Sequence, residues 1–251
     1  MLQRVASFTL TLAVVAAFAG AQSAGKMISY SSGSETVSGY LAAPQGAGKK
    51  PAVVVIHEWW GLNDFAKGKA DSFAKQGYVA LAVDLYRGKV ASDADVAHQL
   101  MRGMPEDRAL RDLKAAVATL RSRPDVDGKH VAAIGWCMGG GWSLNLAIAE
   151  PALAGAVIYY GHLMTEDATI KGLAVPLLGN FGGKDQGIPP GSVSEFEKKA
   201  KAAGKSVDFK IYMEAGHAFA SSRDPNVFRA ADAKDADART DAFFAKVLKG
   251  R

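Results

Sequence analysis

The sequence predicts an α/β fold in which a mostly parallel sheet is covered by helices on both faces. Apolar runs of strand length alternate with segments of helical periodicity along most of the chain, which is typical of sheets built from parallel strands. The run 51–56 is continuously apolar and rich in Val, as expected of a strand buried on both faces. With 251 residues, 49% of them hydrophobic, the chain is long enough to bury the core of one such domain.

The expected elements follow one another in a regular order. A leading antiparallel ribbon is expected at 27–30 and 37–43, because Ser and Gly residues between the two runs favour a turn. Further strands are expected at 51–56, 78–83, 131–134, 154–160, 175–180 and 207–212. Helices are expected at 64–76, 92–104, 105–121, 138–149, 192–203 and 232–248, with a loop up to residue 172 before the strand at 175. Because no repeat or linker interrupts this series, residues 22–251 are expected to form a single domain.

Residue types at the helix ends set three of these boundaries. Asp64 is expected to cap the helix that Gly77 ends. Pro105 suits the first position of a helix, and Ser192 with Glu195 forms the pattern of a capping box. These signals predict helix starts at 64, 105 and 192.

The first 21 residues have the pattern of a secretory signal peptide. Arg4 supplies a positive charge, 8–18 is an apolar run, and Ala19-Gly20-Ala21 has the small residues of a cleavage site. The apolar run is too short for a transmembrane span, and an uncleaved anchor is the alternative. We therefore expect cleavage after Ala21, export to a bacterial periplasm, and no stable membrane association.

Charge and composition argue against several classes of function. The formal net charge is +5, but the Lys residues are scattered and no basic block with interleaved aromatics occurs, so nucleic-acid binding is not expected. His, Asp and Glu residues show no metal-ligand spacing, so no metal is expected, and no cofactor is expected either. The chain is expected to be a monomer that acts on a small molecule.

The most informative stretch is Gly135-Trp136-Cys137-Met138-Gly139-Gly140, which stands between an expected strand and an expected helix. This is the layout of a nucleophile elbow, G-x-S-x-G, with Cys in place of Ser. The turn is sharp, and side chains two residues either side would collide, so Gly135 and Gly139 carry no Cβ. The helix N-terminus favours a thiolate and a developing oxyanion. The alternative interpretation is a buried structural Cys beside a tight turn.

Cysteine usage favours the chemical interpretation. Cys137 is the only cysteine, so no intramolecular disulfide can form even in an oxidising compartment. An exported protein has little reason to keep an unpaired thiol, because such a thiol risks oxidation and mispairing. A chemical role for Cys137 is therefore more plausible than it would be in a cytosolic chain.

Two strand-end loops carry the groups that a nucleophilic thiol needs. Asp185 follows the strand expected at 175–180, and His217 follows the strand expected at 207–212. The chain order Cys137, Asp185, His217 matches the order nucleophile, acid, His of α/β-hydrolases. A base must reach the thiol, and a carboxylate must hold that base in the right tautomer. The alternatives are a loop His satisfied by the backbone and an ordinary turn Asp.

A further loop, His57-Glu58-Trp59-Trp60-Gly61, ends the strand 51–56. In this fold the oxyanion hole takes one N–H from the residue after the nucleophile and one from this loop. These positions nominate the backbone amides of Met138 and Trp59. An ionised Glu58 would oppose the developing charge, whereas a protonated or displaced Glu58 would not.

These motifs, together with Asp84-Leu85-Tyr86, Gly183-Lys184-Asp185 and Ala215-Gly216-His217-Ala218-Phe219, resemble those of the dienelactone hydrolase family (carboxymethylenebutenolidases). The resemblance covers nearly all of the chain after the signal segment, and the Cys elbow with an upstream Glu is specific to that family. It implies a single α/β-hydrolase domain with a triad of Cys137, His217 and Asp185. It also implies that Glu58 interacts with the resting thiol and takes part in generating the thiolate when substrate binds.

Two positions depart from the family pattern. Its dienelactone-specific members bind the substrate carboxylate with an Arg two residues after the Tyr of Asp-Leu-Tyr and a second Arg four residues after the catalytic His. Here those positions hold Gly88 and Ser221, while Arg87 and Arg223 lie one and two positions away. The departures leave open whether dienelactone, or any anionic ester, is a substrate. A solvated surface position is the alternative for both arginines.

An apolar substrate pocket is expected around the elbow. The residues nominated for substrate contact are Trp60, Tyr86, Arg87, Trp136, His162 and Phe219. Aromatic rings suit an aromatic or cyclic ester, although rings beside an elbow also serve as core packing. His57 and His98 are expected to be structural or exposed.

The sequence therefore predicts an exported thiol hydrolase of esters or lactones. In this prediction Cys137 attacks the acyl carbon, and His217, oriented by Asp185, transfers the protons. Water then releases the acyl group. A different class of function is a degenerate hydrolase fold that binds or senses, with Cys137 as an oxidisable thiol. A third is acyl transfer to an acceptor other than water.

Overall fold

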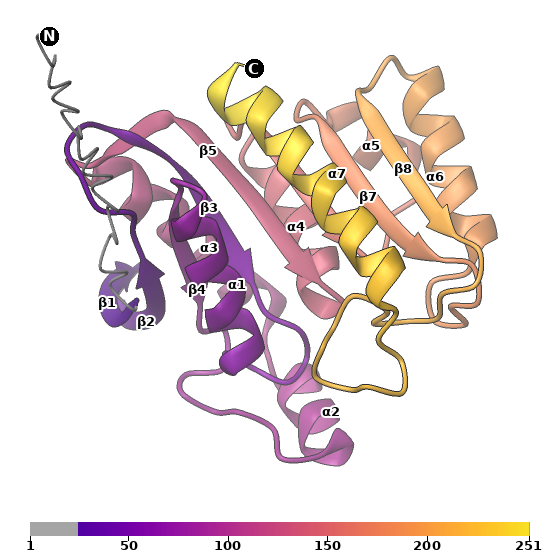
Figure 1. Ribbon diagram of the computed structural model, residues 1–251, viewed down its shortest axis with the longest axis horizontal. Coiled ribbons are helices and arrows are strands. Elements are labelled where there is room, and N and C mark those ends of the chain that lie inside the picture. The colour runs from indigo at the N-terminus through magenta and orange to yellow at the C-terminus, as the bar shows by residue number, and fades with distance from the viewer. Residues whose placement is uncertain (1–24, 251) are drawn as a thin grey trace, which may run out of the picture.

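The computed structural model describes residues 25–250 and contains an eight-stranded sheet between two layers of helices (Figure 1). Its strands are β1 (Lys26–Ser32), β2 (Glu35–Ala42), β3 (Lys50–Ile56), β4 (Val79–Val83), β5 (Val126–Trp136), β6 (Gly155–Tyr159), β7 (Leu177–Gly182) and β8 (Val207–Tyr212). Its helices are α1 (Asp64–Lys75), α2 (Ala94–Arg102), α3 (Glu106–Ser122), α4 (Met138–Ala149), α5 (Asp167–Gly172), α6 (Pro190–Ala202) and α7 (Ala230–Lys249). The expected signal peptide, residues 1–21, lies outside the described residues.

The sheet has the strand order β1-β2-β4-β3-β5-β6-β7-β8. Strands β3 to β8 are parallel to their neighbours, and the leading hairpin of β1 and β2 joins β4 in antiparallel fashion. The predicted α/β fold with a mostly parallel sheet is confirmed. Because the parallel strands share one direction, their carboxyl ends meet at one edge of the sheet, where ligand sites of such folds gather.

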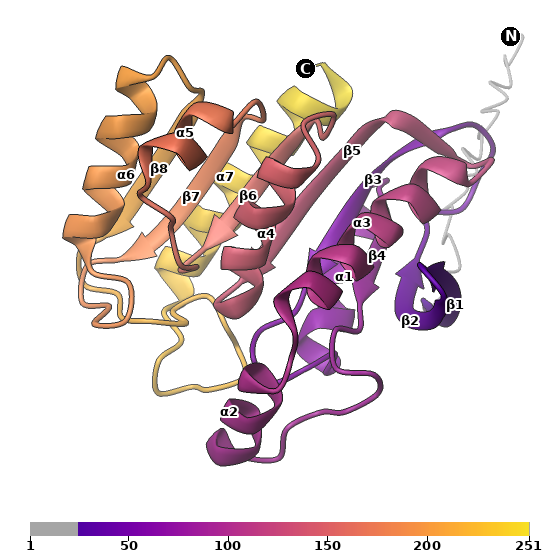
Figure 2. The same ribbon diagram turned by 180° about the vertical axis from the view of Figure 1, so that it is seen from behind.

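Helices cover both faces of this sheet. On one face α1 and α7 pack against the side chains of Val53, Val55 and Ile134. On the other face α3, α4, α5 and α6 pack against Val54, Ile56 and neighbouring strand residues, as the two opposite views show (Figures 1 and 2). Strands buried on both sides explain the continuous apolar runs of the sequence. None of the described helices is long and apolar enough to span a membrane.

Several predicted helix boundaries are wrong, and each error has a local cause. Helix α1 is capped by Asn63, whose side chain accepts a hydrogen bond from the Ala66 N–H at 3.2 Å, so Asp64 is the first helical residue rather than the cap. Pro105 lies just outside α3. The capping box predicted at Ser192 does not form, because α6 already begins at Pro190.

Two further differences concern lengths. The segment predicted to be a loop contains the short helix α5. No side chain caps the N-terminus of this helix before Asp167, so the sequence carried no capping signal for it. Strand β5 begins at Val126, earlier than predicted, because its first residues continue the pairing with β3 through an irregular register. Neither difference moves the carboxyl ends of the strands.

Glycines fix how closely α4 approaches the sheet. A Cβ at Gly139 would overlap the backbone of Ile56 and His57, and a Cβ at Gly140 would overlap the carbonyl of Tyr159. The first turn of α4 therefore lies directly against the ends of β3 and β6. Only residues without a side chain allow this approach.

We expect Gly139→Ala to lower the free energy of unfolding by about 3 kcal/mol or more, because the added methyl group has only backbone to displace. The matched control is Gly68→Ala in α1, where a Cβ meets nothing within 4 Å. That change should raise the free energy of unfolding by about 0.5–1 kcal/mol, since Ala is the better helix former. Urea denaturation of both variants measures the difference, and equal effects would contradict the packing argument.

Candidate active site

Cys137 stands at the turn between β5 and α4. Its backbone has φ 55° and ψ −120°, a left-handed φ that is strained for a residue with a side chain. A Cβ at Gly135 would overlap the carbonyl of Gly139, so the two glycines of the motif are required by contact with each other. The turn holds Cys137 at the N-cap of α4, half-buried, at the carboxyl edge of the sheet.

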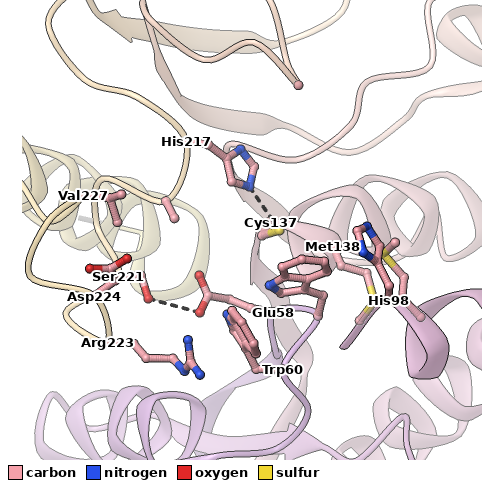
Figure 3. Close-up of a pocket in the computed structure, with 14 residues that line it drawn as sticks. Glu58, Trp60, His98, Cys137, Met138, His217, Ser221, Arg223, Asp224 and Val227 are labelled. Carbon is pink, nitrogen blue, oxygen red and sulfur yellow. Dashed lines mark hydrogen bonds between the residues drawn. The ribbon is translucent and has the colours of Figure 1, made fainter. Parts of the chain in front are cut away.

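The three residues predicted to form a triad are in contact. His217 Nε2 lies 3.1 Å from Cys137 Sγ, and His217 Nδ1 lies 2.7 Å from Asp185 Oδ2 (Figure 3 draws the contact between His217 and Cys137). Asp185 is buried, and its other carboxylate oxygen accepts hydrogen bonds from the N–H groups of Gly187 and Ile188, both at 2.9 Å. The carboxylate is therefore fixed from two sides, and the ring is held between it and the sulfur.

These contacts shift the ionisation of the His217–Asp185 pair. Burial alone would lower the pKa of His217, but hydrogen bonds with Asp185 and Cys137 raise that pKa from 6.5 to about 10. Burial would raise the pKa of Asp185, but the hydrogen bonds from His217 and from the backbone lower it. The hydrogen bonds with Asp185 and Cys137 therefore favour the protonated form of His217.

Glu58 lies close to the triad but is held by a different residue. Its side chain is 3% exposed, and Ser221 donates a hydrogen bond to its Oε2 at 3.1 Å (Figure 3). Burial raises the pKa of Glu58, against the opposing effect of that hydrogen bond. Among the described residues no hydrogen bond joins Glu58 to Cys137, the contact that the family resemblance implies. Ser221, at a position where dienelactone-specific members carry Arg, is the residue that holds the carboxyl group instead.

His57 fixes the backbone of the Glu58 loop. Its Nε2 accepts a hydrogen bond from the Leu85 N–H at 3.3 Å, so its Nδ1 carries the proton that is donated to the Glu58 carbonyl at 2.5 Å. Burial lowers the pKa of His57, which agrees with a neutral ring. The expected structural role of His57 is thus visible as a link between the loops that follow β3 and β4.

The two residues whose backbone amides were nominated for an oxyanion hole line the same cavity as Cys137. Met138 is the first residue of α4, where N–H groups have no partner within the helix. Trp59 belongs to the loop that His57 holds. No hydrogen bond among the described residues uses the N–H of Met138 or Trp59, so both remain available to an anionic oxygen.

A cavity of about 580 Å³ opens beside Cys137. The residues that line it are Glu58, Trp59, Trp60, His98, Met101, Cys137, Met138, Gly187, His217, Ala218, Ser221, Arg223, Asp224 and Val227. Arg223 stacks on the ring of Trp60, with its guanidinium carbon 3.5 Å from the ring centroid (Figure 3). Of Arg87 and Arg223, the two arginines near the family's carboxylate-binding positions, Arg223 is the one that lines this cavity, although Arg87 was the one nominated for substrate contact.

A second cavity of about 440 Å³ meets the first at Cys137, Met138 and His217. The exposed side chain of His162, one of the residues nominated for substrate contact, lines this second cavity. Trp60 and His162 are thus the two nominated substrate-contact residues that reach a cavity. The site has a lobe on either side of the sulfur.

The other four nominated residues lie outside both cavities, and their prediction as substrate contacts is corrected. Trp136 is buried under α1, with its ring against Phe65. Phe219 is fully buried beside Tyr160. The Tyr86 hydroxyl donates a hydrogen bond to Met138 Sδ at 3.2 Å and so contacts the residue that follows Cys137 in the elbow.

Arg87 has a different structural role. Its Nη1 lies 2.6 Å from the fully buried carboxylate of Asp112 in α3, and its Nη2 lies 3.3 Å from Glu35 in β2. Burial of the guanidinium is offset by these two carboxylates, which raise its pKa. Arg87 therefore ties the loop after β4 to α3 and to the hairpin, and its charge is already compensated there.

Several residues of the site were not predicted. Met101 at the end of α2, and Asp224 and Val227 in the loop between β8 and α7, line the first cavity. The only available signal was that both segments follow strand ends, which does not say which side chain points inward. No group of three or more His, Cys, Asp or Glu residues in the described chain is arranged to hold a metal ion.

Comparison with known proteins gives a consistent result. The model of the dienelactone hydrolase family matches residues 37–248. A protein of Methylorubrum extorquens named as a carboxymethylenebutenolidase is 32% identical over 219 residues, which cover 82% of this chain and 75% of that protein. Protein usf of Aquifex pyrophilus is 34% identical over 231 residues, which cover 89% of this chain and 99% of that protein.

Solved structures agree with the fold. A structure described as a dienelactone hydrolase from Klebsiella pneumoniae has a TM-score of 0.81 at 28% identity, covering 89% of this chain and 100% of its own. A dienelactone hydrolase-like promiscuous phosphotriesterase from metagenomic libraries has a TM-score of 0.81 at 26% identity, covering 89% and 98%. The predicted α/β-hydrolase fold is confirmed.

We expect the imidazole of His217 to titrate far above the ordinary range for His. Its NMR signals should keep the protonated shift through neutral pH and titrate near pH 10. Asp185→Asn and Cys137→Ala each remove one of the two groups that raise the pKa of His217, so each should move the midpoint down toward 6.5. His217→Ala assigns the signal. A midpoint near 6.5 in the unmodified protein would contradict the contact network.

Proposed function

Because the chain belongs to the dienelactone hydrolase family, we propose that it hydrolyses carboxylic esters or lactones through a thioester formed on Cys137. The family and its named relatives make the chain an ester or lactone hydrolase. The proposal adds the residues and the order of the steps. The observation that supports it is the pair of contacts joining Asp185, His217 and Cys137 beside an open cavity.

The proposed reaction begins from the thiolate and imidazolium pair. The Cys137 sulfur forms a bond to the acyl carbon, and the carbonyl oxygen becomes an anion that the Trp59 and Met138 N–H groups stabilise. As the carbon–oxygen bond of the ester breaks, His217 gives its proton to the leaving oxygen. A water then loses a proton to His217 and attacks the thioester, which releases the acid and restores the pair.

Glu58 is proposed to stay neutral during these steps. Burial raises its pKa, and a protonated carboxyl group does not oppose the charge on the oxyanion. The Ser221 hydroxyl donates a hydrogen bond to the Glu58 carboxyl group at 3.1 Å and holds it in place. This arrangement supports a thiolate generated by His217, with Glu58 as a wall of the cavity.

We expect Cys137→Ala to lower kcat for small aryl esters by at least about a thousandfold, because among the described residues Cys137 is the nucleophile that has a hydrogen bond with His217. The unmodified protein should release a burst of product from an activated ester, as a thioester intermediate requires. Thermal unfolding of the variant serves as the control for an intact fold. Turnover at the unmodified rate would exclude the thiol mechanism.

A redox role for Cys137 is the second candidate. It is favoured by the half-buried position of the only cysteine at the wall of a cavity, where small oxidants have access. A sensor needs neither a His nor an Asp in hydrogen-bond contact, so the contact network favours the hydrolase. Absence of any burst, together with rapid reaction of the thiol with hydrogen peroxide, would reverse this preference.

Export to a bacterial periplasm is proposed from residues 1–21 alone. Expression of the full chain in a bacterium with a secretion pathway should yield a periplasmic protein that begins at Gln22. Replacing Val14 and Val15 by Asp interrupts the apolar run and should keep the longer form in the cytoplasm. N-terminal sequencing of the two fractions measures the outcome, and an uncleaved chain in the membrane fraction would favour an anchor.

A further inference from the structure

The cavities at the site continue along helix α4. The second cavity shares Trp142, Asn145, Glu106 and Met164 with a third cavity of about 400 Å³. The three hollows therefore form a series from Arg223, past the sulfur of Cys137, to the far end of α4. A compact lactone would occupy only the hollow around the sulfur.

One face of α4 forms the floor of this groove. Of the groove-lining residues on α4, Gly141, Asn145, Ile148 and Ala149 are only partly buried. They follow Met138 at spacings of three and four residues, so they form one stripe on the helix. At 1.5 Å per residue the stripe runs about 16 Å away from the elbow. Figure 2 shows α4 between α3 and α5, the elements that border the stripe.

The walls of the groove are mainly apolar. Leu110 of α3 lines the far end, and Met101 of α2 lines the end beside the sulfur. Met164 and Ile188 come from the loops before α5 and before α6. Trp142 is 8% exposed and lies at the junction of the second and third cavities. A methylene chain that leaves water for this surface gains free energy along its whole length.

The charges at the far end of the groove disfavour an anionic occupant. Glu106 lines the second and third cavities, and Asp107 lines the third; both side chains are exposed at the start of α3. Within the described residues, neither of these two cavities is lined by Lys or Arg, and the charged His217 lies at the end beside the sulfur. A carboxylate placed here would lose hydration and meet two like charges. A neutral chain meets no such penalty.

We propose that this groove, lined along Gly141, Asn145, Ile148 and Ala149, binds the extended alkyl chain of a neutral ester. The inference rests on the proposed function, since the chain must be attached to the ester bond that Cys137 attacks. It differs from a specificity for compact anionic lactones, because the groove is long, apolar and acidic at its rim. Its occupant is defined as an open-chain ester with a medium-length hydrocarbon arm.

Two series of substrates test the proposal and tell which arm of the ester is bound. One series keeps the nitrophenyl alcohol and lengthens the acyl group from acetyl to dodecanoyl. The other keeps the acetyl group and lengthens the alcohol from ethyl to dodecyl. In one series kcat/KM should rise by roughly two- to fourfold for each added methylene until the groove is full, the gain expected from partial to full burial of a CH2 group. A flat or falling profile in both series would overturn the proposal.

Substitutions along the stripe measure how far the bound chain extends along α4. Ala149→Phe fills the far end, and Asn145→Phe fills the middle; both positions are partly exposed, so a larger side chain is tolerated there. Ala149→Phe should lower the ratio of kcat/KM for decanoyl to butanoyl ester by about tenfold. Asn145→Phe should lower the preference for longer acyl chains at a shorter chain length than Ala149→Phe does. Ala202→Phe, at an exposed position on α6, is the matched control and should keep the profile of the unmodified protein.

The outcomes separate the two claims. If acetyl and butanoyl esters are hydrolysed in a reaction that needs Cys137, but the profile is flat and both Phe variants leave it unchanged, the groove proposal fails and the hydrolase stands. If no ester of either series reacts, the proposed function itself fails. If chain length matters but the two Phe variants have no effect, the chain lies in another lobe and the groove is wrongly assigned.

Discussion

The contact between the Cys137 sulfur and the His217 ring depends on the order of the strands. The sulfur follows β5 and the ring follows β8, so β6 and β7 lie between them. Three strand spacings separate these strands by about 14 Å. The loop from Tyr212 to His217 turns back over the end of the intervening β7: its Ala215 N–H donates to the Tyr212 carbonyl at 3.0 Å, and the Ala215 carbonyl accepts from the Lys184 N–H at 2.8 Å. This turn brings the ring to Asp185, which follows β7, and to the elbow.

Close packing around the elbow fixes the other half of the site. Glycines at 135 and 139 let the strained turn and the start of α4 lie against the backbone of β3. The same contact brings the loop after β3 beside the turn, and His57 ties that loop to Leu85 after β4. Trp59 and Met138, whose N–H groups have no partner among the described residues, thereby line the same cavity as the sulfur. Such groups need no reorganisation when charge develops on a bound oxygen.

Sequence reasoning predicted the parts of the molecule that follow from one-dimensional rules. Buried strands are recognisable in the sequence as continuous apolar runs. Because the strand-end loops of a parallel sheet meet at one edge, the contacts among Cys137, Asp185 and His217 could be predicted. The direction in which each side chain points could not be predicted. Trp136 and Arg87 carry chemically suitable groups, but α1 covers the first and Asp112 binds the second. The cavity walls come from helix faces and loops whose orientation depends on packing far along the chain.

The unpaired state of the sulfur has a practical consequence for quantitative work. Since the chain has a single cysteine, any maleimide or disulfide reagent that couples to the folded protein couples at the elbow. The moles of label taken up therefore count competent centres directly, without a correction for background thiols. A fluorophore attached there also reports the polarity of both lobes from their common boundary.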